Sequence, residues 1–165
     1  MSCRLGAPPS PTPSAVVPVG APTTAVDAPA ETLALQTSLN QLRQANELPI
    51  LEFPASLQQI ALARALEVAA SSELRNVVET SGAPAVLTML ERAGYQGRVA
   101  EHLLLVTDPG DGLASTATRA WFSDPAHRAD LLDPGYLLSG IGIVSHIEGW
   151  IVVQVLVEND AEVAP

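Results

Sequence analysis

Histidine and cysteine, two residue types suited to acid–base or metal chemistry, are rare in this sequence of 165 residues. The histidines are His102, His127 and His146, and the single cysteine is Cys3. A glutamate and a histidine can share proton transfer, which makes Glu101 and His127 the candidate catalytic base and acid. Three imidazoles and a carboxylate also suffice as zinc ligands on paper. The histidines lack the H-x-x-x-H spacing of a helical metal site, so the elements that carry them decide their role.

A short strand is expected from Ala100 to Val106, and it carries both Glu101 and His102. Successive strand residues point to opposite faces, so Glu101 shares its side with the other odd-numbered residues, which are apolar. A covered carboxylate requires a partner, and both a structural ion pair and a bound ligand are open. His102 points to the other face, and His146 is expected at a hairpin end, facing solvent.

The segment that carries His127 is expected to be a short helix. It follows a helix over residues 112–122 that places Trp121 on its buried side. Asp124-Pro125 has the pattern of an N-cap followed by proline in the first turn, and Ser123 is expected as a turn or cap residue. The positive end of the helix dipole disfavours a charged ring at His127. A neutral ring can bind a metal or accept a hydrogen bond, and a purely structural hydrogen bond is the alternative.

Apolar periodicity predicts helices in the first half of the folded body. The first begins near Glu31, ends before Pro49 and has one apolar face, formed by Leu35, Leu39 and Leu42. Pro54 opens the second helix, which has two apolar stripes: Leu57, Ala61, Ala65 and Val68 in one, and Leu62, Leu66 and Ala69 in the other. Two apolar faces predict that this helix is largely buried. A third helix is expected from Pro84 to Gly94.

The sequence ends in a predicted hairpin of the strands Ile141–His146 and Trp150–Glu158. The last strand is apolar on both faces, with Gln154 as its one polar residue in the middle. Both faces of the sheet are therefore expected to be covered, and the preceding helices are the natural cover. The order of elements predicts an α+β fold, an α-β-α sandwich with a small antiparallel sheet of about three strands.

Composition limits the partners and the domain organisation. The net charge is −10, and the basic residues are eight scattered arginines, which argues against nucleic acid and anionic lipid as ligands. No apolar run is long enough to cross a bilayer. Residues 1–31 are predicted to be a disordered Pro/Ala/Thr-rich tether, residues 32–160 a single domain, and residues 161–165 a disordered C-terminus. A monomer is expected.

Cys3 lies near the start of this tether. It is the single cysteine of the sequence, so an internal disulfide is excluded. A cysteine before a Pro/Thr/Ser-rich tether is typical of a mature bacterial lipoprotein, which makes Cys3 the candidate lipidation site. The alternative is an ordinary N-terminus with an incidental cysteine. Met1-Ser2-Cys3-Arg4 has no charged start and no apolar segment of a signal peptide. The expected location is extracytoplasmic, either secreted or lipid-tethered to the cell surface.

Several motifs, in this order, resemble those of bacterial CAP domains (cysteine-rich secretory, antigen 5, pathogenesis-related 1; SCP-like). Leu39-Asn40-Gln41-Leu42-Arg43 with Leu48-Pro49 resembles "LN-x-x-R-x-x-x-G-L-P". Ala93-Gly94-Tyr95 before Glu101 resembles "A-G-Y … G-E-N". The segment from Trp121 to Leu132 resembles "W-x-x-S-P-x-H-R-x-N-L-L". Further matches are the alanine stripe Leu57, Ala61 and Ala65, the segment Ser139-Gly140-Ile141-Gly142-Ile143, and the closing strand from Trp150.

The resemblance implies an α-β-α sandwich around a cleft that is lined in well-preserved members by two histidines and two glutamates. Glu101 matches the glutamate of "GEN", and His127 matches the second histidine. The second glutamate would fall near Ser123 or Asp124, and residues 71–76, where the first histidine belongs, contain none. The implied ligand cleft contains Glu101, His127, Trp121, Ser123 and Asp124. A zinc or other divalent metal site on His127 is a weak candidate, because the set is incomplete.

Three functions follow from these features. The first is a non-enzymatic, extracytoplasmic CAP/SCP-like module that binds a small ligand, a lipid or a cell-wall component. The alternative is a hydrolase of peptides or cell-wall polymers that uses Glu101 and His127. A third is a wholly structural domain whose site has been lost. The absent first histidine favours the binding module, and fold resemblance alone does not decide among them.

Overall fold

The computed structural model describes residues 28–71 and 84–158. Cys3, most of the predicted tether and the predicted disordered C-terminus lie outside the described residues. Within them, the elements run in the order α1 (Ala28–Ala45), α2 (Ala55–Ala69), α4 (Pro84–Arg92), β1 (Val99–Val106), α5 (Leu113–Ser123), α6 (Pro125–Leu131), β2 (Tyr136–His146) and β3 (Gly149–Glu158). None of these described helices is long and apolar enough to cross a membrane.

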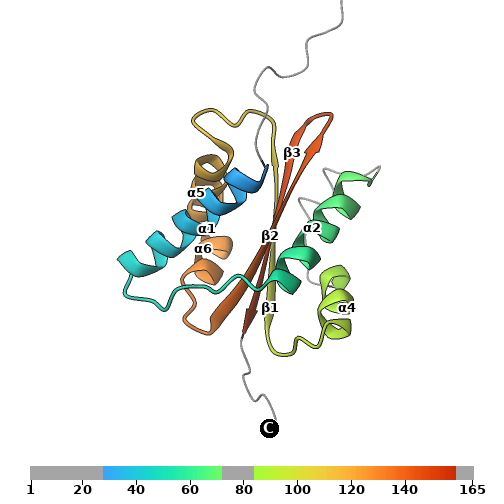
Figure 1. Ribbon diagram of the computed structural model, residues 1–165. Coiled ribbons are helices and arrows are strands. Elements are labelled where there is room, and N and C mark those ends of the chain that lie inside the picture. Colours follow the sequence, from blue (N-terminus) through green and yellow to red (C-terminus); the bar gives the residue numbers. More distant parts are fainter. Residues whose placement is uncertain (1–27, 72–83, 159–165) are drawn as a thin grey trace, which may run out of the picture.

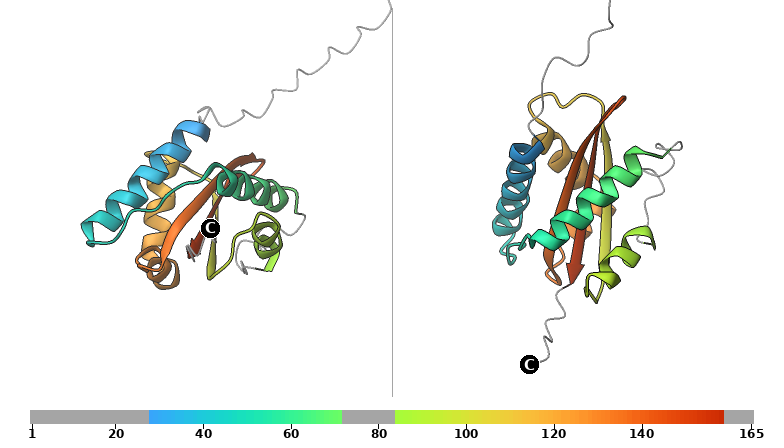
Figure 2. Two further views of the ribbon diagram at one scale, coloured as in Figure 1. Left: turned by 60° about the horizontal axis from the view of Figure 1, so that its bottom comes forward. Right: turned by 45° about the vertical axis from the view of Figure 1, so that its right-hand side comes forward.

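The three strands form one antiparallel sheet in the order β1-β3-β2. Helices α1, α5 and α6 cover one face of this sheet, and α2 and α4 cover the other (Figures 1 and 2). The predicted α+β sandwich with a three-stranded antiparallel sheet is confirmed. β3 lies in the centre, so β2 forms one edge of the sheet, between the two helical layers.

Each face of the sheet has its own hydrophobic core. On the α2–α4 side, β3 contributes Ile151, Val153, Val155 and Val157, which pack against Leu57, Ala61 and Ala65 of α2. On the other side, Val152 packs with the buried residues Leu35, Leu39, Leu113, Ala117 and Trp121. The alternation expected for the last strand is therefore present, and both faces of β3 are covered by packed side chains.

β2 begins at Tyr136, earlier than the predicted start at Ile141. Its first residues pair with the end of β3 and, through a parallel bridge, with Glu52 in the loop before α2. The Glu52 N–H donates to the carbonyl of Leu137, and the Ser139 N–H donates to the carbonyl of Glu52. Pairing with a distant loop leaves no periodic signal in the local sequence, which explains the missed residues.

Two predictions about the first helices need correction. α1 begins at Ala28, so the boundary at residue 31 placed the first turn of this helix in the tether. The second stripe of α2 is not buried, because Leu62 is 44% and Leu66 is 56% exposed. α2 packs on the sheet through its first stripe alone, and no other element covers its outer side within the described residues.

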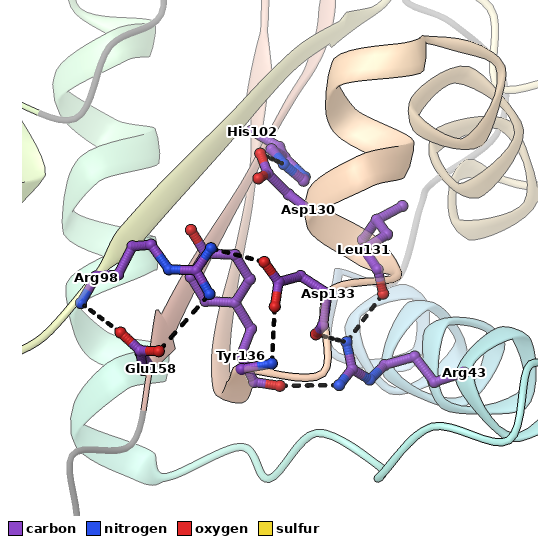
Figure 3. A network of polar contacts seen from close by, with 9 residues as sticks. Arg43, Arg98, His102, Asp130, Leu131, Asp133, Tyr136 and Glu158 are labelled. Atoms are coloured by element: carbon purple, nitrogen blue, oxygen red, sulfur yellow. Dashed lines mark hydrogen bonds and ion pairs between the residues drawn. The ribbon is translucent and has the colours of Figure 1, made fainter.

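Arg43 and Asn40 of α1 form hydrogen bonds with the backbone of segments that connect the helices to the sheet. Arg43 is buried and donates hydrogen bonds of 2.7–3.0 Å to four backbone carbonyls, those of Pro49, Leu131, Asp133 and Tyr136. Figure 3 shows the bonds to the last three. The side-chain amide of Asn40 pairs with both backbone groups of Leu51. These contacts give a structural reason for the Asn and Arg of the first motif.

Candidate functional site

His102 and His127 meet on the α5–α6 side of the sheet, with 4.6 Å between their ring centroids. His102 extends from β1 and is 1% exposed, under the ring of Trp121. His127 lies early in α6, where the Asp124 carboxylate accepts hydrogen bonds from the backbone N–H groups of Ala126 and His127. The predicted N-cap is therefore present, and it fixes His127 above the sheet.

A chain of polar groups includes this pair and runs from the half-buried Asp130 to the buried Gln154 and Ser139. Nε2 of His102 is 3.2 Å from a carboxylate oxygen of Asp130, and Nδ1 is 3.0 Å from the side-chain oxygen of Gln154 (Figure 3 shows Asp130 beside His102). Gln154 in turn reaches the hydroxyl of Ser139. Both ring nitrogens of His102 therefore have a polar partner, one from α6 and one from β3.

His127 is held in its neutral form. Burial lowers its pKa below the ordinary value, and the neighbouring His102 acts in the same direction. Asp124 and Asp130 oppose this shift. The pKa of the Asp124 carboxyl is itself lowered, first by the hydrogen bond from the His127 backbone. The lowered pKa of His127 agrees in direction with the neutral ring expected from the sequence, and burial is its first cause.

Glu101 lies on the opposite face of the sheet, under α2. Its carboxylate accepts a hydrogen bond of 2.8 Å from Arg64, and its side chain is fully buried. Arg64 also contacts Glu67 one turn along α2. The second oxygen of Glu101 has no hydrogen-bond partner among the residues that the structure describes. Of the two interpretations that the sequence left open for Glu101, the ion pair is the one formed.

The structure does not bring the predicted cleft residues together. Trp121, Asp124 and His127 gather on the α5–α6 side, whereas Glu101 points into the other core, so the sheet separates Glu101 from His127. Ser123 is exposed and donates to the carbonyl of Arg119, as a helix-end residue does. A proton relay between Glu101 and His127 would have to cross the sheet.

The described residues contain no group of three or more His, Cys, Asp or Glu side chains arranged to hold a metal ion. His146 is on the hairpin, where its ring accepts a hydrogen bond from the Glu148 N–H. His146 is the last residue of β2, and the ring pair at α6 consists of His102 and His127. The residues at the His102–His127 pair offer two imidazoles and the Asp130 carboxylate, and Asp130 and Gln154 already contact the His102 ring.

A groove of about 490 Å³ lies elsewhere, between α1 and α2 at the β2 edge of the sheet (Figure 1 shows the two helices on either side of β2). None of the side chains that line it is charged: Ala28, Pro29, Thr32, Leu33 and Gln36 of α1, Gln58, Gln59 and Leu62 of α2, and Ile141 and Ile143 of β2. Leu33 is 65% exposed at its rim, opposite Leu62. We call this site the α1–α2 groove.

Sequence reasoning missed the α1–α2 groove because its residues carry no chemical motif. The available signal was the second apolar stripe of α2, which was interpreted as buried. Leu33 also falls outside the buried face of α1, at a position that a periodic pattern assigns to solvent. Only the packing of α1 and α2 on opposite faces of one sheet brings these leucines to the same edge.

Comparisons with known proteins place these observations in a family. The model of the family described as "Cysteine-rich secretory protein family" (CAP) matches residues 36–156. No curated protein matches the sequence. Among solved structures, a cysteine-rich secretory protein from Staphylococcus aureus has a TM-score of 0.63 at 19% identity and covers 81% of this chain and 40% of that chain.

Two further structures have the same fold. An outer surface protein from Borrelia burgdorferi has a TM-score of 0.64 at 18% identity and covers 81% of this chain and 96% of that chain. An extracellular protein containing a SCP domain from Bacillus anthracis has a TM-score of 0.60 at 17% identity, over 80% of this chain and 41% of that chain. This chain thus spans under half the length of the S. aureus and B. anthracis proteins.

The family match runs from the middle of α1 to near the end of β3, so it includes both helical layers and nearly the whole sheet. The order of motifs agrees with it, from the Asn and Arg of α1 to the closing strand. The chain therefore belongs to the cysteine-rich secretory protein (CAP) family.

Proposed function

We propose that this chain is a non-enzymatic, extracytoplasmic binding module that holds its ligand in the α1–α2 groove. The observation that carries the proposal is the groove itself, with its volume of about 490 Å³ and its uncharged lining. Ligand sites are concave, mostly apolar and provided with a few polar groups, and volumes of this order are typical of them. Here the polar groups are the amides of Gln36, Gln58 and Gln59.

The exposed leucines support a binding role. Leu33 and Leu62 are large apolar side chains in contact with water, on two helices that face each other across the groove. Water is readily displaced from such a surface by an apolar ligand, because each buried leucine side chain stabilises the complex by about 1.5–3 kcal/mol. A small molecule, a lipid or a cell-wall fragment with an uncharged portion fits this lining.

The geometry favours binding over the hydrolytic alternative. A Glu101–His127 mechanism requires both side chains on one side of the sheet, and Glu101 is instead paired with Arg64 in the opposite core. His102 is already held by Gln154 and Asp130. These contacts are those of structural groups.

The location outside the cytoplasm is supported by the relatives, which include a Borrelia outer surface protein and an extracellular Bacillus protein. Cys3 as a lipid anchor would tether the domain to the cell surface. Mass spectrometry of the protein produced from its native locus tests this part. An unmodified Cys3 contradicts the tether and leaves the groove proposal standing.

Binding of a neutral apolar dye, N-phenyl-1-naphthylamine, tests the groove. We expect saturable fluorescence enhancement, and about tenfold weaker binding by Leu62→Gln, because one buried leucine contact is lost. Leu66→Gln is the matched control, since Leu66 is similarly exposed on α2 but does not line the groove. The absence of saturable binding, or equal binding by the two variants, contradicts the proposal.

A further inference from the structure

Ile141 and Ile143 of β2, an outer strand of the sheet, line the α1–α2 groove, and part of the outer edge of β2 is unpaired. Antiparallel pairing alternates, so the N–H and C=O groups of Ser139, Ile141 and Ile143 point away from β3. The outward N–H of Ser139 is bonded to Glu52, which fixes this alternation. Beyond Ser139 the loop leaves the strand, and the edge enters the groove.

α2 satisfies one more of these groups. The side-chain oxygen of Gln58 accepts a hydrogen bond from the Ile141 N–H. Past this point, the part of the chain that the structure describes provides no partner for the carbonyl of Ile141 or for the N–H and carbonyl of Ile143. Both residues line the groove, where Ile141 is 3% and Ile143 is 5% exposed, so an added strand would have to displace the side chains that cover this edge, Gln58 among them.

We infer that the α1–α2 groove binds an extended, uncharged peptide segment, which adds as a strand to the outer edge of β2 at Ile141 and Ile143. This inference rests on the proposed function of the groove and names its ligand class. Strand addition supplies main-chain hydrogen bonds to an open edge, and flanking pockets select the side chains. An acyl chain fills apolar space but leaves the outward groups of Ile143 unpaired.

The residues on the two walls of the groove determine which peptide side chains fit there. Successive residues of an added strand point alternately toward α1 and toward α2. The α1 wall presents Leu33 and Thr32, and the α2 wall presents Leu62 and Gln59. Both sets of peptide side chains therefore meet uncharged surfaces, and small apolar or hydroxyl residues suit both.

Charge gives a second restriction on the sequence of the bound peptide. The chain has a net charge of −10, whereas the groove lining carries no charge. An acidic side chain in the groove would lose its hydration and gain no cationic partner, and the field of the whole chain would repel it. The predicted segment therefore lacks Asp and Glu.

A capped pentapeptide, acetyl-Val-Thr-Val-Thr-Val-amide, is the probe for titration against the ¹⁵N-labelled full chain. We expect saturable shifts of the Ile141, Ile143 and Ser145 amide signals, and at least about tenfold slower hydrogen exchange at the Ile143 N–H. Leu62→Gln should weaken binding about tenfold, whereas Leu66→Gln should not change it.

N-methylated peptides separate strand addition from apolar contact. Methyl groups on residues 2, 3 and 4 of the peptide block both of its edges and should weaken binding at least about tenfold. Methyl groups on residues 2 and 4 alone leave one edge free, so binding should persist. Equal binding by all three peptides, no binding of the parent peptide, or slow Ile143 exchange in the free chain would overturn the inference.

Palmitate, tested as a third ligand, distinguishes failure of strand addition from failure of the groove as a ligand site. If palmitate and the naphthylamine dye bind but the peptide does not, the groove is a site for acyl chains, and only the inference of strand addition fails. If none of the three binds, the groove is not a ligand site, and the proposed function fails with it.

Discussion

The guanidinium of Arg64 lies over the carboxylate of Glu101, with 2.8 Å between Nε and Oε1. Glu101 extends from β1, and Arg64 extends from α2, so the pair ties this helix to the sheet. The Glu101 side chain is fully buried, and that of Arg64 is 11% exposed. A buried pair gains little over an apolar pair of similar size, but each partner depends strongly on the other.

Arg64→Met should therefore destabilise the fold by about 3–5 kcal/mol, because it leaves the Glu101 carboxylate buried without a cation. The double variant Arg64→Met/Glu101→Met should regain most of this loss, since it removes both charges. Urea unfolding at neutral pH measures the free energies, and the double-mutant cycle gives the coupling. A coupling energy near zero would show that Glu101 is stabilised by other groups.

Much of this architecture could be predicted from the sequence. The apolar alternation of β3 and the Asp124-Pro125 pair each report a local physical requirement, so the central strand and the α6 N-cap were correctly placed. That Glu101 needs a partner also followed from its apolar strand neighbours, although the kind of partner stayed open. Its partner Arg64 could not be identified, because the contact joins residues that are far apart in the sequence.

The site itself was less predictable. Family motifs placed Glu101 and His127 in one cleft, but strand alternation puts Glu101 and His102 on opposite faces, and His102 is the residue that meets His127. The groove depends on how α1 and α2 pack around the edge of β2. This packing brings together leucines and glutamines that belong to no motif. No local sequence pattern therefore predicts the groove.

Arg43 provides a second test, because it joins three segments through four backbone carbonyls. Arg43→Met should cost about 3–5 kcal/mol, since the carbonyls lose a charged donor and several become unsatisfied. Arg119→Met on the exposed side of α5 is the control and should change stability by less than about 0.5 kcal/mol. Chemical denaturation of both variants makes the comparison. A loss at Arg43 no larger than at Arg119 would refute this role.

His127 should make stability dependent on pH. Its pKa in the folded state is lowered from the ordinary value of 6.5, first by burial and then by His102. The unfolded chain therefore binds more protons than the folded chain just below pH 6.5, so the free energy of unfolding rises with pH through that window. Well above pH 6.5 the ring is neutral in both states, and this contribution is constant.

His127→Gln should remove this part of the pH dependence, as measured by urea unfolding between about pH 5 and 7.5. His146→Gln, on the hairpin, is the matched control and should retain it. A direct NMR titration of His127 in the folded wild-type chain provides the independent check. A midpoint above 6.5 would mean that Asp124 and Asp130 outweigh burial, and the sign of the prediction would be wrong.

The close approach of α2 to β2 depends on two glycines of one motif, Gly140 and Gly142. A Cβ atom added at Gly142 would lie 2.2 Å from the carbonyl oxygen of Ala61, and one at Gly140 would lie equally close to that of Leu57. Neither backbone can yield without moving α2. Gly142→Ala should therefore destabilise the fold by about 1–3 kcal/mol, although alanine is otherwise the better strand residue.

Ser145→Ala, exposed on the same strand, is the control for Gly142→Ala and should change stability by less than about 0.5 kcal/mol. The displaced helix should also pull Gln58 from the Ile141 N–H, because both contacts depend on the same turn of α2. Amide exchange at Ile141 should then accelerate in Gly142→Ala and stay unchanged in Ser145→Ala. Unchanged exchange together with unchanged stability would show that α2 can shift freely, and the α1–α2 groove would then not be a fixed binding surface.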